Sequence, residues 1–422
     1  MNFIEAYTQG QKGANKGLPM GPGLSAVSQA INDIQRAKIY TIAAAPKGGK
    51  STFADVGFVI EPAVYVLEHN IKIQSALALV TKELETTLDS SARAVLNSKY
   101  ETLTKELIDL EIIYNSYEID RISKEFDFAA HFIDRDYGIT EVLLPEGKTY
   151  RNGKVVKISA EFLKGELTYD NSDPKAEKEI IRVPQNLFEI LVKVYENRIV
   201  PLFGEYNEKG ERIKKGLIIF LENKDNPTGV RNWLMAYAKT NGEFLYKTSI
   251  KDGITFNRLI GYKPFNPDKF VIIITDHLRK LLPERGFKMK ETVDKFSEYA
   301  VEFRNICKFT FVHIIHLNRS ISDISRRQFD DDKLFPQSDD IKETGNLSED
   351  SNYIFTMFNP NDDKFNLKKH FGTILRTPQG ALIYPNLRTI HLVESRHCFC
   401  PQHFRVNMIG ETKKFTEVII KK

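Results

Sequence analysis

The loop at residues 44–52 constrains the fold more than any other segment. It reads Ala44-Ala45-Pro46-Lys47-Gly48-Gly49-Lys50-Ser51-Thr52, and it lies between the apolar run at residues 39–43 and a helix-like segment. A nucleoside triphosphate is held by inward-facing backbone N–H groups, a lysine near the β- and γ-phosphates, a hydroxyl on Mg²⁺ and a helix N-terminus. Strand, loop and helix in this order therefore predict a nucleotide-binding P-loop.

The P-loop predicts which residues contact the nucleotide. Lys50 is expected to reach the β- and γ-phosphates, and the Ser51 hydroxyl is expected to bind Mg²⁺. The residues expected to surround the phosphates are Pro46, Lys47, Gly48, Gly49, Lys50, Ser51 and Thr52. One position departs from the pattern G-x-x-x-x-G-K-[ST], because its first glycine is Ala44 here. A chance Gly-Lys-Ser loop is the alternative, and the strand before and helix after it argue against that alternative.

Composition limits the possible classes of protein. At 422 residues and 41% hydrophobic content, the chain can bury one large core or two modest ones. The formal net charge of +4 is small, so a nucleic-acid role has to rest on local basic loops. The N-terminus lacks a basic-then-apolar signal pattern, and no apolar run approaches the roughly 20 residues needed to span a bilayer. These features predict a cytoplasmic protein with no membrane partner.

The cysteines do not predict a disulfide framework. Cys307, Cys398 and Cys400 are the three cysteines, an odd number that fits reduced thiols. The segment from His397 to His403 could suggest zinc, but it lacks the paired spacing of structural zinc sites. We therefore favour an ordinary strand that carries thiols.

Several short apolar runs predict the main sheet. Residues 217–221, 271–274 and 311–315 are continuous apolar runs separated by helix-like segments, which is typical of strands covered on both faces. The fold class expected is α/β, with a mostly parallel central sheet.

The organisation along the chain is one nucleotide-binding domain with two insertions. Glycine and proline dominate residues 10–23, so we expect residues 1–23 to form an arm or linker and residues 24–422 the domain. Leucines at helical spacing across residues 75–110 predict a helical-hairpin insertion. Asn152-Gly153 between alternating residues predicts a β-hairpin insertion within residues 145–175.

Acidic residues at strand ends complete the predicted catalytic site. Asp276 follows the run at residues 271–275, where a P-loop enzyme places the carboxylate that holds Mg²⁺. ATP hydrolysis also needs a carboxylate that orients the attacking water. Glu118, which follows the apolar run that begins at Ile112, is our candidate, and Glu222 is its rival. A helix-capping role for either glutamate stays open.

The order of these motifs resembles the RecA-type ATPase domain of DnaB and Twinkle-like replicative helicases, most closely the shortened versions of tailed bacteriophages. Residues 17–52 resemble that family's entry into the P-loop, and Asn115-Ser116-Tyr117-Glu118 is similar to its F-S-L-E strand. Asp276-His277-Leu278 resembles its D-Y-L segment. The resemblance implies a RecA-like P-loop core and gives Glu118 the catalytic role ahead of Glu222.

Two further elements of the family are present with substitutions. Residues 313–319 resemble the L-S-Q-L-N-R strand, with His316 in place of the glutamine that senses the γ-phosphate. Val393-Glu394-Ser395-Arg396 resembles the K-x-R element that reaches the neighbouring subunit's ATP site. The resemblance implies that Arg396 is an arginine finger, while Glu394 replaces the family's lysine. Salt-bridge formation at a strand edge is the alternative role for Arg396.

The resemblance also implies a DNA-binding loop. Residues 336–345 are similar to the P-x-L-S-D-L-R-E-S-G loop that faces the central channel in these helicases. The residues that would contact single-stranded DNA are Arg319, Arg326, Arg327, Lys333, Lys342 and Gly345. The acidic residues 330–332 favour the alternative, a solvated loop.

Taken as a whole, the resemblance implies an ATP-dependent, ring-forming helicase or translocase on single-stranded DNA in DNA replication. By analogy the ring is a hexamer with ATP and Mg²⁺ as cofactors, primase or other replisome proteins as possible partners, and the host cytoplasm as its location if a phage encodes it. The alternative is an accessory protein with a RecA fold that binds ATP and DNA without unwinding, which the substitutions Ala44, His316 and Glu394 favour.

Overall fold

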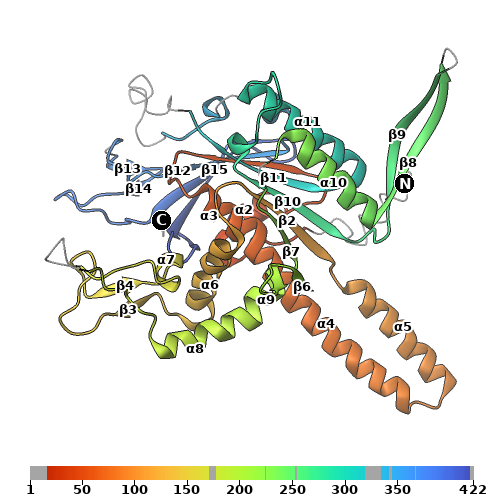
Figure 1. Ribbon diagram of the computed structural model, residues 1–422, viewed down its shortest axis with the longest axis horizontal. Coiled ribbons are helices and arrows are strands. Elements are labelled where there is room, and N and C mark those ends of the chain that lie inside the picture. The colour runs from red at the N-terminus through yellow and green to blue at the C-terminus, as the bar shows by residue number, and fades with distance from the viewer. Residues whose placement is uncertain are drawn as a thin grey trace.

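A nine-stranded sheet forms the centre of the molecule in the computed structural model (Figure 1). The structure describes residues 17–170, 177–223, 225–251, 254–318, 334–341, 345–365 and 367–418. The strand order is β17-β16-β15-β12-β1-β11-β10-β2-β7, and neighbouring strands from β12 to β7 pair in parallel. These parallel strands are β1 Ile39–Ala44, β2 Leu110–Ser116, β7 Ile218–Leu221, β10 Phe270–Asp276, β11 Thr310–His316 and β12 Tyr353–Phe358. The predicted α/β class and mostly parallel sheet are confirmed.

The parallel strands are apolar throughout because helices cover both faces of the sheet. Successive side chains alternate between faces, so Tyr40 and Ile42 belong to one core cluster and Ile39 and Ala43 to the other. The first face is covered by α3 Lys50–Ala54, the π-helical turn η2 Asp55–Ile60, the start of α4 Glu61–Thr86, and α6 Arg121–Tyr137. The second face is covered by α10 Pro227–Asn241 and α11 Met289–Cys307, which lie above the sheet in Figure 1.

An antiparallel extension widens the sheet beyond β12. It consists of β15 Leu387–Ser395, β16 Gln402–Ile409 and β17 Lys414–Glu417, and β15 pairs with β12 in antiparallel register. We expected a thiol-bearing strand at Cys398 and Cys400, but this is wrong, because both cysteines lie in the loop between β15 and β16. There the Cys398 Sγ lies 3.0 Å from the Ser395 Oγ.

The predicted helical hairpin is confirmed. The first turns of α4 are buried in the core, and the rest of the helix projects from it beside the antiparallel α5 Ser90–Glu106 (Figure 1). Asp89 caps α5, since its Oδ1 accepts a hydrogen bond of 2.7 Å from the Ala92 amide. None of the residues of α5 is buried, although the structure describes all of them. The hairpin therefore contributes little to the core.

The β-hairpin at Asn152-Gly153 is also confirmed. Arg151 and Asn152 have φ angles of 51° and 62°, and the Tyr150 and Gly153 backbones exchange hydrogen bonds of 3.0 and 2.9 Å. Two left-handed residues are typical of a tight hairpin turn, and here they are Arg151 and Asn152, with Gly153 directly after them. The arms continue as β3 Glu141–Leu143 and β4 Val155–Lys157.

A second, longer hairpin is absent from our sequence interpretation. Strands β8 Gly242–Lys251 and β9 Ile254–Pro264 pair in antiparallel register and project from the molecule (Figure 1). The missed signal is Asp252-Gly253, a strong hairpin dipeptide between two β-rich runs.

The described part of the predicted N-terminal arm is packed. The Leu18 amide donates a 3.0 Å hydrogen bond to the Ile34 carbonyl, and the Ile34 amide donates a 2.9 Å hydrogen bond to the Leu18 carbonyl. The side chains of Leu18 and Met20 are buried. Our expectation of an arm is therefore wrong for residues 17–23, and residues 1–16 lie outside the described residues. Apolar side chains decided the outcome, because burying Leu18 and Met20 outweighs the backbone freedom of the neighbouring glycines.

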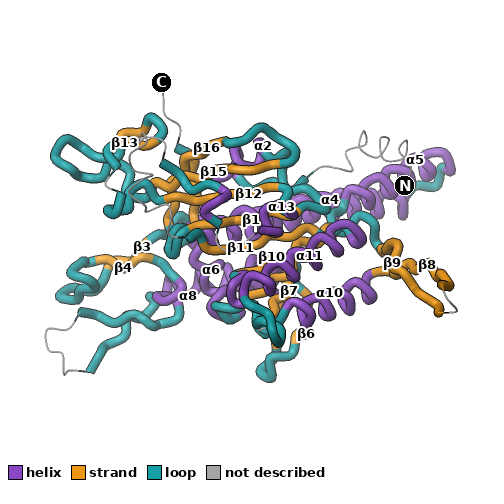
Figure 2. The backbone as a smooth tube through the Cα atoms, turned by 90° about the horizontal axis from the view of Figure 1, so that it is seen from above, coloured by secondary structure: helices purple, strands orange, loops and turns teal. Residues whose placement is uncertain are grey.

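The remaining elements are short. They are η1 Pro22–Leu24, α2 Ser25–Ala30, α7 Ala160–Leu163, α8 Gln185–Val194, η3 Tyr195–Ile199, α9 Val200–Phe203, β5 Gly204–Tyr206, β6 Arg212–Lys215, η4 Leu278–Lys280, η7 Ser338–Asp340, α13 Gly345–Asp350, β13 Lys369–His370 and β14 Thr373–Ile374. Figure 2 shows how β13 and the β3–β4 pair lie at one end of the molecule and the β8–β9 and α4–α5 hairpins at the other. Within the described ranges, no helix is both long and apolar enough to cross a membrane.

Candidate functional site

The P-loop connects the end of β1 to the start of α3. Gly49 precedes α3 with a φ of 94°, in the left-handed region that favours glycine, and an added Cβ there would lie 2.5 Å from the Met408 sulfur. Gly48 is equally restricted, because its added Cβ would lie 2.9 Å from the Ala44 Cβ. Ala44 is the last residue of β1, is buried, and is not among the residues with positive φ. Its backbone is therefore one that alanine adopts without strain.

Ser51 and Asp276 face each other across the site. Parallel pairing of β10 with β2 and β11 brings the end of β10 beside the P-loop, and the Ser51 Oγ lies 3.4 Å from the Asp276 Oδ1. Asp276 is buried, and burial raises the pKa of its carboxyl group. A hydroxyl and a carboxylate are the hard oxygen ligands that Mg²⁺ prefers, so this pair fits the ion.

Lys50 lies at the N-terminus of α3 and is largely buried. Burial lowers the pKa of its ammonium group, while Asp276 and Glu118 act in the opposite direction. The Lys50 ammonium and the N-terminus of α3 are suited to bind a phosphate, whereas the nearby carboxylates are suited to bind a cation such as Mg²⁺.

The two candidate glutamates have different surroundings. Glu118 lies two residues beyond β2, its side chain is 40% exposed, and its Oε1 lies 3.5 Å from the Lys280 Nζ. It is close enough to affect the ionisation of Lys50 and Asp276. The Glu222 Oε1 instead accepts a 2.6 Å hydrogen bond from the Arg121 amide at the start of α6. Glu222 therefore caps a helix, whereas the Glu118 carboxylate belongs to the P-loop edge.

His316 ends β11 directly beside the P-loop strand. It pairs in register with Ala44, and its ring centroid lies 4.1 Å from that of His277, which follows a cis peptide bond from Asp276. Burial lowers the pKa of His316, and Lys50 lowers it further. The imidazole is therefore neutral near pH 7 and offers a single N–H donor. His277 was not predicted as a neighbour, and no local signal in the sequence indicates its contact with His316.

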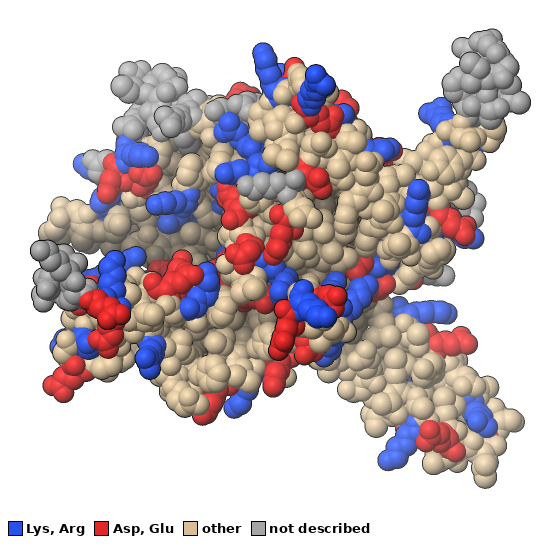
Figure 3. Space-filling model, in the orientation of Figure 1, with Lys and Arg blue, Asp and Glu red and all other residues tan. Residues whose placement is uncertain are grey.

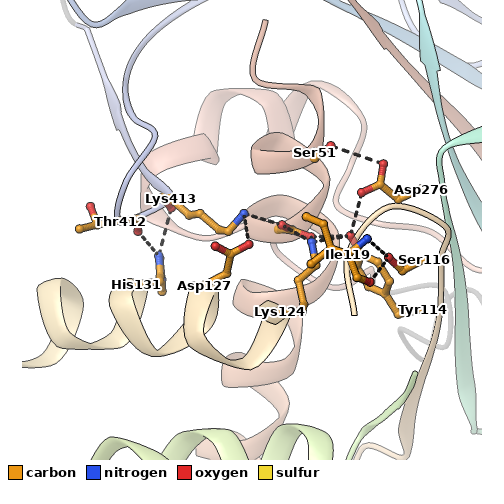
Figure 4. A network of polar contacts seen from close by, with 11 residues as sticks. Ser51, Tyr114, Ser116, Ile119, Lys124, Asp127, His131, Asp276, Thr412 and Lys413 are labelled. Atoms are coloured by element: carbon orange, nitrogen blue, oxygen red, sulfur yellow. Dashed lines mark hydrogen bonds and ion pairs between the residues drawn. The ribbon is translucent and has the colours of Figure 1, made fainter. Parts of the chain in front are cut away.

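A buried ionic network lies beneath the site (Figure 4). It joins Asp276 through Tyr114 to Asp55, and from there to Lys124 and Lys413. Sequence reasoning missed all of these residues except Asp276. Lys413 and Asp55 are 358 positions apart, so no spacing pattern could have joined them.

Arg396 lies at the edge of the sheet where the parallel strands β1 and β12 begin, opposite the edge where β1 ends and the P-loop follows. It follows β15, whose last residue Ser395 pairs with Tyr353 at the start of β12, and Tyr353 in turn pairs with Tyr40 near the start of β1. The P-loop begins where β1 ends, and a strand of this length spans roughly 17 Å. Arg396 therefore cannot reach the P-loop of its own chain.

Other cations accompany Arg396 at this edge. The Lys38 Nζ lies 2.8 Å from the His397 Nε2. Burial lowers the pKa of Arg304, and Arg396 lowers it further. Burial also lowers the pKa of Lys38, and the positive charge of Arg304 lowers it further. These positive groups are thus close enough to repel one another, and a bound anion would relieve that repulsion.

The predicted DNA-binding residues are only partly described. Arg319, Arg326, Arg327, Lys333 and Lys342 lie outside the described residues, and Gly345 begins α13. The segment 334–341 is anchored beside β11, because the Asn318 amide donates a 2.7 Å hydrogen bond to the Asp340 carbonyl. Leu317 and Ile341 form a β-bridge next to this bond. On the face drawn in Figure 3, basic and acidic side chains are interspersed, which agrees with the small net charge.

Comparisons with known proteins identify the fold. No protein-family model and no curated protein sequence matches the chain. Among solved structures, the ATPase domain of a phage helicase is similar with a TM-score of 0.53 and 12% identity, covering 99% of this chain and 97% of that one. A DnaB-like replicative helicase, described together with its interactions with primase, has a TM-score of 0.54 and 11% identity over 99% of this chain and 68% of that one. The chain thus has the RecA-like fold of DnaB-type helicase ATPase domains.

Proposed function

We propose that this protein is an ATP-dependent DNA helicase or translocase of the DnaB type that acts on single-stranded DNA during DNA replication. The observation that carries the proposal is the division of catalytic groups between the two edges of one sheet. Lys50, Ser51, Asp276 and Glu118 lie at the P-loop edge, and Arg396 lies at the other. Such a division suits a motor whose sites form between subunits.

At the P-loop edge, each side chain has one role in hydrolysis. The P-loop backbone and Lys50 hold the β- and γ-phosphates, and Ser51 and Asp276 hold Mg²⁺. When bound, Mg²⁺ neutralises phosphate charge. Glu118 orients water in line with the γ-phosphate, and its partly exposed carboxylate leaves room for that water. His316 lies beside Ala44 at the position proposed to sense the γ-phosphate, and its one N–H would exchange the Ala44 backbone for the phosphate.

The site is completed by a second copy of the chain. Because Arg396 is remote from its own P-loop, it acts in the site of a neighbouring subunit, where its guanidinium stabilises charge on the transferring phosphoryl group. One surface of each copy then contacts a different surface of the next, and such a head-to-tail contact gives a ring when the rotation closes and a filament when it does not. We propose a hexamer, as in the phage-type helicases that the sequence resembles.

Single-stranded DNA is the proposed polymer substrate. Arg319, Arg326, Arg327, Lys342 and Gly345, which flank the segment 334–341 in the sequence, would contact its phosphates. This segment starts from the same sheet edge as the P-loop, so nucleotide and DNA contacts could be coupled through β11. Primase or another replisome protein is a possible partner.

The test is ATP hydrolysis by purified protein with and without single-stranded DNA, together with strand separation on a forked duplex. We expect stimulation by single-stranded DNA, unwinding of the fork, and loss of both in Lys50→Ala. ATP and DNA binding without unwinding would favour the alternative, an accessory protein with the same fold. Hydrolysis that Lys50→Ala leaves unchanged would contradict the proposal.

A further inference from the structure

Asp55 is a buried carboxylate with three donors from three different elements. Its Oδ2 lies 3.1 Å from the Lys124 Nζ of α6 and 2.9 Å from the Lys413 Nζ, and its Oδ1 accepts a 2.8 Å hydrogen bond from the Tyr114 hydroxyl of β2. Asp55 and Lys124 are both 0% exposed. Burial opposes ionisation of Asp55, but the two lysines outweigh it and lower the pKa of the carboxyl group. The network is therefore a set of paired charges.

The Tyr114 hydroxyl connects this network to the proposed metal ligand. It lies 3.4 Å from the Asp276 Oδ2, while the other oxygen of Asp276, Oδ1, lies 3.4 Å from the Ser51 Oγ. The two carboxylate oxygens thus have separate neighbours, Tyr114 on the protein side and Ser51 on the nucleotide side. Figure 4 shows this series of contacting side chains, which extends from Lys413 to Ser51.

Lys413 comes from the turn between β16 and β17, and that turn is fastened to α6. The His131 Nδ1 lies 3.0 Å from the carbonyl oxygens of Thr412 and Lys413, so it donates to both. The Thr412 hydroxyl donates a 2.7 Å hydrogen bond to the Asp134 Oδ2. A second carboxylate, Asp127, lies 3.1 Å from the Lys413 Nζ. The position of Lys413 is therefore set by several contacts.

A purely structural core does not need these charges. Apolar residues of similar volume often replace a buried ion pair without loss of stability, because removing two charges from water is costly. The surrounding side chains on this face include Phe53, Phe58 and Phe128, which would pack well against apolar substitutes. The charged groups reach the proposed metal ligand through the Tyr114 hydroxyl, which lies between Asp55 and Asp276. This location indicates a role in the site itself.

We propose that Tyr114 and Lys413 are positioning residues for Asp276. Lys413 and Lys124 hold Asp55, and Lys124 also donates a 3.1 Å hydrogen bond to the Tyr114 oxygen. The single hydroxyl proton of Tyr114 is shared between Asp55 and the Oδ2 of Asp276, and this contact keeps Oδ1 of Asp276 facing Ser51 and Mg²⁺. The inference rests on the proposed nucleotide site and adds to it a connection with the β16–β17 turn. Movement of that turn would change the orientation of the metal ligand.

The main test compares two buried tyrosines. Tyr114→Phe removes the hydroxyl and keeps the ring that stacks on Phe220, and Tyr40→Phe is the matched control. Tyr40 is also fully buried, but its hydroxyl accepts a 2.8 Å hydrogen bond from the Gln35 amide before β1 begins, away from the P-loop. The measurement is binding of a fluorescent ATP analogue during a Mg²⁺ titration, with unfolding followed in parallel.

We expect Tyr114→Phe to raise the Mg²⁺ concentration at half-maximal binding by about tenfold, the size of effect typical for a residue that orients a metal ligand. Binding in excess EDTA should not change, and Tyr40→Phe should keep the wild-type Mg²⁺ midpoint. An unchanged midpoint in Tyr114→Phe, beside a normal wild-type titration, would overturn this inference alone. Absence of Mg²⁺-dependent binding in the wild-type protein would overturn the proposed function as well.

A second test addresses Lys413. Lys413→Met should raise the Mg²⁺ midpoint about threefold, and the effect should not add to that of Tyr114→Phe, because both act through one chain of contacts. Lys157→Met is its control, since Lys157 forms an exposed 3.3 Å ion pair with Glu411 of the same turn. If Lys413→Met does not fold, Lys413→Arg replaces it and should shift the midpoint in the same direction. Full additivity, or equal shifts in the Lys157 control, would contradict the connection.

Discussion

The two edges of the parallel sheet differ in how their charges are balanced. At the P-loop edge, Lys50 lies near Asp276 and Glu118, so an ammonium group is accompanied by carboxylates of the same chain. At the other edge, Lys38, Arg304 and Arg396 lie close together, and the pKa values of Lys38 and Arg304 are lowered first by burial and then by a neighbouring cation. At Arg304, the Asp350 carboxylate offsets part of this decrease. The first edge thus combines positive and negative groups, as a site for a metal ion and a phosphate needs, whereas the second edge gathers positive groups.

Under the proposed function, this difference divides the catalytic groups into two half-sites that cannot meet within one molecule. The parallel strands separate them, because β1 begins beside Arg396 and ends at the P-loop. The excess of cations at the second edge would be neutralised by a phosphate that a neighbouring copy binds. The predictions below test this division of roles.

The largest effect is expected from mixing two inactive variants. Lys50→Ala and Arg396→Ala should each lower kcat for ATP hydrolysis by about a thousandfold, because each removes a group that stabilises phosphoryl charge. A mixture should recover part of the activity, since the intact P-loop of one variant can meet the intact Arg396 of the other. The measurement is the steady-state rate at several mixing ratios. A mixture no more active than its components would contradict catalysis between subunits.

Between the two edges, His313 should make stability depend on pH. It is fully buried within β11, and burial lowers its pKa from 6.5 to about 3. The unfolded chain takes up a proton below pH 6.5 while the folded chain does not, so stability is complete above pH 6.5 and falls as the pH decreases toward 3. This residue should account for about 3 kcal/mol between pH 7 and pH 4.

The check is chemical denaturation of wild type and His313→Leu across this pH range. The substitution should flatten the loss of stability on acidification, whatever its effect at pH 7. Two curves that run parallel from pH 7 to pH 4 would show that His313 is not the group responsible.

Substitutions of the two candidate glutamates should have clearly different effects on kcat. Glu118→Gln should lower kcat about a hundredfold with little change in nucleotide affinity, because only the orientation of water is lost. Glu222→Gln should change kcat by less than about threefold, since it keeps an oxygen that can accept from the Arg121 amide. Kinetics and nucleotide binding measured on both variants decide the assignment. The reverse order of effects would transfer the catalytic role to Glu222.

The smallest effect is expected at the other edge. Lys38→Ala should lower kcat by about fivefold and leave nucleotide affinity unchanged, because Lys38 adds positive charge beside Arg396 but does not contact its own P-loop. Lys308→Ala is a matched control, since this exposed lysine donates a 2.9 Å hydrogen bond to the Asn305 carbonyl. Equal effects in the two variants would remove Lys38 from the proposed site.

Much of the fold could be predicted because its signals are local. The apolar runs that became β1, β10 and β11 are buried on both faces, which is why they carry no alternation. Asn152-Gly153 predicted a hairpin that the structure contains, although the two left-handed residues of its turn are Arg151 and Asn152. Leu18 and Met20 were misjudged, since their burial depends on a partner segment at Ile34 that glycine content does not reveal.

The sequence by itself predicted a nucleotide-binding loop in this protein. A P-loop is one contiguous segment whose backbone geometry follows from its own residues, so Lys50 and Ser51 could be assigned before any fold was known. Tertiary structure alone decided that Glu222 caps a helix, that Arg396 lies at the far edge of the sheet, and that Lys413 pairs with Asp55. The physical reason is that burial and long-range pairing set the environment of a charge, and neither is encoded in the spacing of residues along the chain.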